Sequence, residues 1–145
     1  MSSEGYPNMS TINHVAAVVR DLEKAIKVLT DGFGFRSEPI SEVRELGVRV
    51  AFLQAENTRV ELIQPVASGP YLEFLEKGQL GFNHMAIEVD RIDSALQELK
   101  KIGIAPSGSK FSGAKGDVQN LDLSTTAELR LQIFESKKRN EKSLK

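Results

Sequence analysis

The sequence contains no cysteine among its 145 residues. Disulfide bridges, thiolate zinc sites and cysteine nucleophiles are therefore excluded. It also lacks an excess of charge of either sign, because 19 basic side chains oppose 20 acidic ones and the net charge is −1. A general nucleic-acid binder needs a surplus of lysine and arginine, so we expect no nucleic-acid partner.

Long apolar runs are missing as well. No run approaches the roughly 18 residues that suggest a membrane span, and residues 1–10 lack the basic-then-apolar layout of a secretion signal. We therefore expect a cytoplasmic protein with no membrane partner. Hydrophobic residues make up 40% and charged residues 27%, which is typical of a globular protein of one domain or two small fused modules.

Two parts of the chain resemble each other at a spacing of about 70 residues. The segment 12–19 aligns with 82–89, and both contain Asn-His followed by apolar residues. Each is followed by apolar positions with the i, i+3, i+4, i+7 spacing of a helix with one buried stripe, then by an apolar-Gly-apolar exit. The helix positions are Leu22, Ala25, Ile26 and Leu29, aligned with Ile92, Ala95, Leu96 and Leu99. We infer two copies of one module.

Each module begins as a strand followed by a helix. In the first copy an extended segment near 36–43, then strands at 48–53 and 59–64, complete a βαβββ order. In the second copy 105–116 holds the remaining strand or a loose substitute, and 117–123 with 128–134 form the closing hairpin. The sequence therefore predicts an α+β fold in a single domain. Its parts are modules at roughly 11–65 and 81–135, a linker helix at roughly 70–77, and a disordered tail at 136–145.

His14 and His84 are the only histidines, and they occupy the same position in the two copies. One histidine on an apolar strand is usually a packed core residue. Two at equivalent positions converge on one point if the modules pair around a pseudo-two-fold axis. Because neutral imidazole is a common metal ligand, the pair indicates a metal site.

Two further ligands come from the last strand of each module. Glu61 interrupts an apolar run, and aligning the apolar frames places Gln132 opposite it. Taken singly, Glu61 could instead lie exposed on an edge strand and Gln132 on a polar outer face. Together, His14, Glu61, His84 and Gln132 offer nitrogen and oxygen donors that suit a divalent Co, Ni, Mn, Zn or Fe ion.

Three basic residues are candidates for binding substrate. Lys110 and Lys115 lie in a Ser/Gly-rich segment, 107–116, whose backbone could hold a phosphate or a CoA tail. The alternative is a mobile surface loop. Arg130, expected beside Gln132, could bind a substrate carboxylate or could point into solvent.

Several motifs resemble the vicinal oxygen chelate superfamily, which includes the glyoxalases and the bleomycin resistance proteins. The likeness is greatest to the methylmalonyl-CoA epimerase branch. It implies paired βαβββ modules that form a curved sheet around a metal-binding cleft, a small-molecule substrate, and usually a homodimer. The motifs are Asn13-His14-Val15-Ala16, Arg20 to Ala25, Gly47-Val48, Asn57 to Leu62, Phe74 to Lys77 and His84 to Asp90.

The resemblance implies a metal-dependent isomerase or epimerase that abstracts the proton next to a carbonyl of an acyl-CoA, with catalytic residues at Glu61 and Gln132. The sequence departs from the family at Gln132, where epimerases have a glutamate, and at Val50, where some members have a second one. Glu61 is then the best acid–base candidate. Two alternatives are a glyoxalase I-type lactoylglutathione lyase acting on a hemithioacetal, and a non-catalytic small-molecule binding protein.

Overall fold

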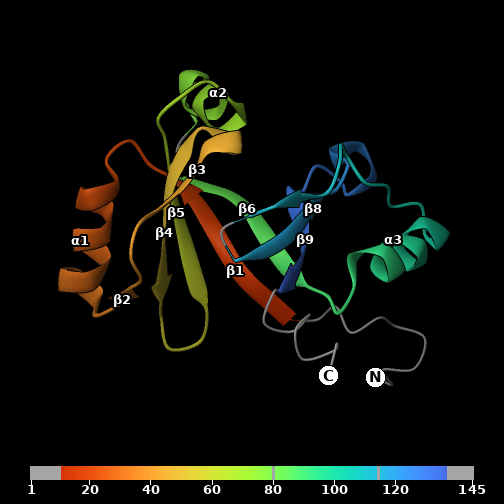
Figure 1. The fold of residues 1–145 in the computed structure, drawn as a ribbon, viewed down its shortest axis with the longest axis horizontal. Coiled ribbons are helices and arrows are strands. Elements are labelled where there is room, and N and C mark those ends of the chain that lie inside the picture. The colour runs from red at the N-terminus through yellow and green to blue at the C-terminus, as the bar shows by residue number, and fades with distance from the viewer. Residues whose placement is uncertain (1–10, 80, 114, 137–145) are drawn as a thin grey trace. The chain divides into compact units, whose positions relative to one another are not determined.

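The computed structural model describes residues 11–79, 81–113 and 115–136 (Figure 1). Their contacts divide them into two compact units. One comprises residues 14–83, and the other comprises the described residues from 84 onward together with 11–13. The division lies inside two strands, β1 (Thr11–Val18) and β6 (Gly81–Glu88), rather than in a linker. That the whole chain forms a single domain stays a prediction. Of the predicted disordered tail, 136–145, only Ser136 is among the described residues, and it is the last residue of a strand.

The first unit follows the predicted βαβββ order. The extended segment after its first helix is broken into two short strands, β2 and β3, which both pair with β4, so that the strands lie in the order β2-β4-β5-β1. The predicted linker helix is also present. The elements are α1 (Leu22–Phe33), β2 (Arg36–Ser37), β3 (Ser41–Val43), a 3₁₀ turn (Arg44–Leu46), β4 (Val48–Gln54), β5 (Arg59–Pro65) and α2 (Pro70–Glu76).

The two helices of this unit cover different faces of its strands. Because successive side chains of a strand point to opposite faces, Ala51 and Leu53 of β4 pack with Leu22 of α1. Val48 and Val50 point the other way and pack with α2 residues instead. Figure 1 shows α1 along one side of β4 and β5, and α2 at one end of these strands. The face opposite α1 is therefore apolar near α2.

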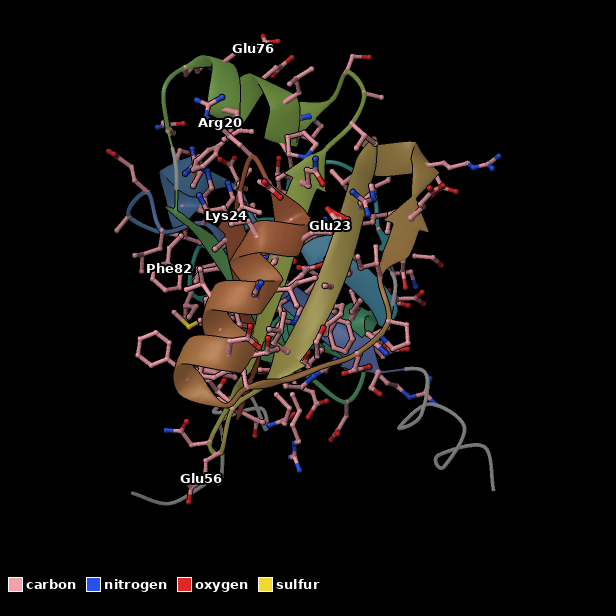
Figure 2. The ribbon with its side chains drawn as sticks, turned by 90° about the vertical axis from the view of Figure 1, so that its left-hand side faces the viewer. Arg20, Glu23, Lys24, Glu56, Glu76 and Phe82 are labelled. Atoms are coloured by element: carbon pink, nitrogen blue, oxygen red, sulfur yellow. The ribbon has the colours of Figure 1, made fainter. Side chains whose placement is uncertain are left out.

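Local sequence signals set the ends of α1. The Asp21 carboxylate accepts a hydrogen bond of 3.0 Å from the backbone N–H of Lys24, as an N-cap does. Gly34 ends the helix in the left-handed conformation, at φ 75°. On the first turn of α1 (Figure 2), Glu23 pairs with Arg49 of β4, and this hydrogen bond holds the pKa of the Glu23 carboxyl below its ordinary value of 4.5. The pair ties α1 to the sheet.

The second unit repeats the βαβββ order of the first, but the strand that follows its helix is only two residues long. Its strands lie in the order β6-β9-β8-β7, and α3 packs on one face through Ile92, Ala95 and Leu99. The segment predicted to hold a strand or a loose substitute contributes the two-residue β7 and an isolated bridge between Pro106 and Leu121. The predicted α+β fold is confirmed. The elements are β6, α3 (Ile92–Lys101), β7 (Phe111–Ser112), β8 (Gly116–Asn120), a 3₁₀ turn (Leu123–Thr125) and β9 (Leu131–Ser136).

The last strand begins later than the sequence predicts, at Leu131 rather than Glu128. Ala127 and Glu128 both have positive φ angles, 54° and 66°, and a backbone in that region cannot continue a strand. The N–H of Glu128 instead donates to the carbonyl oxygen of Leu123 at 2.9 Å. The polar segment before β9 is thus a closed turn.

No helix in the described part of the chain is both long and apolar enough to cross a membrane.

The N-terminus of α3 is capped from a distant strand. The residue at its N-cap position is Arg91, whose side chain makes no capping bond. The Glu135 carboxylate of β9 accepts a hydrogen bond of 2.8 Å from the backbone N–H of Ile92 instead. Glu135 thereby takes over the role that Asp21 has in the first copy.

Replacing Glu135 with alanine should lower the free energy of unfolding by about 1 kcal/mol, because it leaves an N–H at the start of α3 without its acceptor. Glu135→Gln keeps an acceptor oxygen and should lose less. Urea unfolding followed by circular dichroism measures both, with Glu98→Ala, a change in the middle of the same helix, as the control. Equal stability of the wild type and Glu135→Ala would contradict the capping role.

Candidate metal centre

His14 and Glu61 lie together on one face of the first unit. Their strands, β1 and β5, run parallel with Ala16 beside Glu61, and alternation places His14 on the same face as Ala16. His14 Nε2 is 3.3 Å from Glu61 Oε1, and the two side chains are only 4% and 14% exposed. A carboxylate this deeply buried needs a compensating partner. Glu61 is therefore not the exposed edge residue of the alternative interpretation.

An aromatic ring supports this pair. Phe52 of β4 is the register partner of Glu61 and is itself buried. The His14 ring meets it edge-on, with centroids 5.3 Å apart and planes at 86°. The guanidinium carbon of Arg59 lies 4.5 Å from the centroid of the same ring. These contacts fix the imidazole on its strand, and they bring a cation to the same side of the sheet.

The second unit repeats the register with one ligand type changed. In it β6 and β9 run parallel with Ala86 beside Gln132, just as Ala16 lies beside Glu61 in the first unit. His84 and Gln132 are 8% and 7% exposed, so both are buried. They lie on the face that Ala86 and Phe134 share, opposite α3. This register supports the alignment of Gln132 with Glu61.

The donor atoms of the first unit fit a divalent ion. His14 and Glu61 of the first unit each offer one ligand atom of the kind that binds metals, as His84 does in the second unit. Two ligand atoms with bonds of about 2.0–2.1 Å to one ion stand roughly 3 Å apart, and the separation between His14 Nε2 and Glu61 Oε1 is 3.3 Å. The pair is thus spaced as neighbouring ligands of one ion.

The three predicted substrate residues all lie in the second unit. Arg130 is exposed and precedes β9, where its carbonyl oxygen accepts a hydrogen bond from the N–H of Met85. Lys110 is exposed and precedes β7, and Lys115 is half-buried just before β8. Arg130 is therefore not a strand residue beside Gln132, because the turn at Ala127 and Glu128 delays the strand.

Sequence reasoning missed Gln119, which holds the lysine-bearing segment in place. Its side-chain amide donates to the carbonyl oxygens of Ser107, Gly108 and Asn120 at 2.9–3.2 Å. The side chain is 3% exposed. The sequence signal was weak, because Gln119 follows the apolar Val118 but precedes the polar Asn120. A buried amide must nevertheless find partners.

Comparison with known proteins identifies the class. Residues 13–119 match the Glyoxalase/Bleomycin resistance protein/Dioxygenase superfamily, and the chain belongs to this family. Among curated proteins it is 40% identical to the mitochondrial methylmalonyl-CoA epimerase of Mus musculus, over 95 residues that make up 64% of this chain and 53% of that protein. It is 36% identical to the ethylmalonyl-CoA/methylmalonyl-CoA epimerase of Cereibacter sphaeroides, over 72% of this chain and 81% of that protein. The match thus spans about half the length of the mouse relative.

Solved structures agree with the fold. The methylmalonyl-CoA epimerase of Mycobacterium tuberculosis superposes with a TM-score of 0.84 at 20% identity, covering 90% of this chain and 91% of that chain. A methylmalonyl-CoA epimerase in complex with methylmalonyl-CoA and NH4+ gives a TM-score of 0.83 at 17% identity, over 90% and 96% of the two chains. At these identities the likeness shows the fold.

Replacing Gln119 with leucine should lower the free energy of unfolding by about 1 kcal/mol, because it removes the donor of these part-buried hydrogen bonds to backbone carbonyl groups. Backbone amides of 107–110 should also exchange with deuterium faster. Hydrogen-exchange mass spectrometry measures the second effect, and Gln97→Leu, on the exposed side of α3, is the matched control. Unchanged exchange in this segment would show that Gln119 does not anchor it.

Proposed function

We propose that this protein is a metal-dependent epimerase that acts on a carboxylated acyl-CoA thioester, of the methylmalonyl-CoA type. The observation that carries the proposal is the buried pair of His14 and Glu61, with its donor atoms 3.3 Å apart. Named relatives at 36–40% identity are epimerases of such thioesters. Strand-borne ligands are held rigidly, as a catalytic metal site requires.

The proposed site takes two ligands from each unit. His14 and Glu61 come from the first, and His84 and Gln132 from the second. The same register in β1–β5 and in β6–β9 supports this set, because it gives each ligand of one unit an equivalent in the other. The donors suit Co, Ni, Mn, Zn or Fe(II). The proposal includes a pairing of the two modules into a curved sheet around this site.

The reaction removes and returns the proton on the carbon between the thioester and the substrate carboxylate. A divalent ion at this site would supply stabilisation of the negative charge that develops on the carbonyl oxygen. Glu61 is a buried carboxylate on a rigid strand, held beside His14, and so it is positioned to take the proton at an Oε atom. Phe52 of β4 is the register partner of Glu61 and lies on the same face of the sheet.

Gln132 limits the proton transfer that the proposed ligand set can perform. An amide oxygen can ligate a metal, but it does not accept a proton at neutral pH, so the second base of the epimerases is absent from the ligand set. The proton transfer then depends on Glu61. We propose that the chain keeps the reaction type and has a slower rate, or a different acyl group, than a chain with two such carboxylates.

The partners follow from the same site. We propose an acyl-CoA substrate whose phosphates interact with Lys110 and Lys115. We also propose a homodimer, as expected from the resemblance to the family. The cytoplasmic location expected from the sequence remains a prediction.

The proposed function predicts that the metal-loaded protein exchanges the α-proton of methylmalonyl-CoA in deuterated water, which mass spectrometry detects. Glu61→Gln should slow the exchange by about 10²-fold or more, because it removes the proton acceptor. Glu56→Gln, at the exposed turn between β4 and β5 (Figure 2), is the matched control.

Absence of exchange from a protein with bound metal would remove the epimerase proposal. Thiol-dependent turnover of a methylglyoxal hemithioacetal would then identify a glyoxalase I-type lyase. Thermal stabilisation by a ligand without metal would indicate a non-catalytic binding protein.

Restoring the missing carboxylate tests the role of Gln132. The Gln132→Glu variant should bind the metal more tightly and exchange the α-proton about 10²-fold faster, because it supplies a charged ligand and a second base. Isothermal titration with Co²⁺ and the exchange assay measure the two effects. Gln97→Glu adds the same charge on exposed α3 and should change neither. A tighter metal with an unchanged rate would mean that the natural substrate is not methylmalonyl-CoA.

A further inference from the structure

Arg59 lies beside the His14–Glu61 pair within the first unit. It is the first residue of β5, and alternation places it on the same face as Glu61, two residues further along. The register of β1 with β5 pairs Val15 with Val60. His14 and Arg59 also contact the same aromatic ring, that of Phe52. A permanent cation therefore stands on the face that holds the proposed proton acceptor.

This guanidinium is held in place from two directions. Its central carbon lies 4.5 Å from the centroid of the Phe52 ring, and its Nη2 is 3.5 Å from the Glu38 carboxylate. The Arg59 side chain is 22% exposed, so it is largely covered yet reachable by a ligand. Stacking on a ring reduces the freedom that an arginine loses when it binds an anion.

The Arg59 guanidinium keeps N–H donors that can bind a second anion besides Glu38. A guanidinium has five N–H donors in a planar fork that matches a carboxylate, and in the described structure the contact with Glu38 uses Nη2. A long contact of 3.5 Å to a partly exposed carboxylate is a weak one. Phe52 thus orients the Arg59 guanidinium, and the contact with Glu38 leaves other N–H donors of this guanidinium available to a ligand.

The equivalent arginine of the second unit differs. Arg130 stands two residues before Gln132, as Arg59 stands two residues before Glu61, but Arg130 is exposed and precedes its strand. Arg59 is fixed against the Phe52 ring, on the same face as Glu61. A cation held in this way suits a carboxylate that must be kept still during proton transfer.

We propose that Arg59 binds the carboxylate of the substrate and so selects carboxylated acyl-CoA thioesters over uncharged ones. This inference rests on the proposed function for the substrate class, and it assigns to Arg59 the role expected of Arg130 from the sequence. Arg59 acts here as a specificity-determining residue, and the proton is transferred elsewhere, at Glu61.

The test compares the binding of malonyl-CoA and propionyl-CoA to the metal-loaded protein by isothermal titration. These probes share the CoA part and differ in the carboxylate. The wild type should bind malonyl-CoA more tightly, and Arg59→Gln should reduce this preference by about tenfold or more, because a charge-assisted hydrogen bond is lost. Arg59→Lys should keep part of the preference. Arg49→Gln, which removes an arginine from the α1 side of the same sheet, is the matched control and should leave the preference intact.

Each contrary result overturns the inference. Equal weakening of both ligands by Arg59→Gln would mean that Arg59 binds the CoA phosphates, and unchanged affinities for both ligands would mean that Arg59 binds neither anion. A wild type without preference would contradict it as well. The binding assay does not depend on turnover. If the wild type exchanges no proton but Arg59→Gln still loses the preference for malonyl-CoA, the role of Arg59 stands and the epimerase proposal is rejected.

Discussion

The parallel pairing of β1 with β5 is the constraint on which the site depends. It sets Ala16 beside Glu61, and the two-residue period of a strand then brings His14 and Glu61 to one face with their donor atoms 3.3 Å apart. A shift of the register by one residue would turn Glu61 to the face that α1 covers, where only apolar side chains of the core would surround it. The apolar packing around α1 and α2 therefore stabilises the fold and also determines which side chains share the face of His14 and Glu61.

The duplication explains both the likeness and the differences of the two halves. The pairing of Ala86 with Gln132 repeats that of Ala16 with Glu61, so both modules present an imidazole and an oxygen donor from the same two strands. Away from this register the copies have diverged. The first helix uses its own Asp21 as a cap, whereas α3 uses Glu135 from β9. The two copies thus share the register at the proposed ligand positions, even though Glu61 of the first copy is replaced by Gln132 in the second.

Much of the fold and of the candidate site could be predicted from the sequence, because both depend on short-range sequence patterns. The repeat of Asn-His, the helix periodicity and the glycine exits were sufficient for the α+β fold, and the linker helix was found at its expected place. Features that depend on contacts between distant segments were missed. β9 starts late because Ala127 and Glu128 have positive φ angles. Neither is a glycine, the residue type that would have indicated such a backbone in the sequence. The anchoring by Gln119 and the stacking of Arg59 on Phe52 likewise depend on tertiary neighbours. The stacking is the reason that we propose Arg59, rather than Arg130, as the carboxylate-binding residue.

The central claim is that matching strands of a duplicated module supply the ligands of one divalent ion. X-ray absorption spectroscopy of the Co²⁺-loaded protein tests it most directly, because imidazole ligands give a distinct scattering pattern. The account predicts one ion per chain with two imidazole nitrogens in the wild type, and one imidazole in each of His14→Ala and His84→Ala. A wild-type spectrum with one imidazole or none, or one that either substitution leaves unchanged, would contradict it.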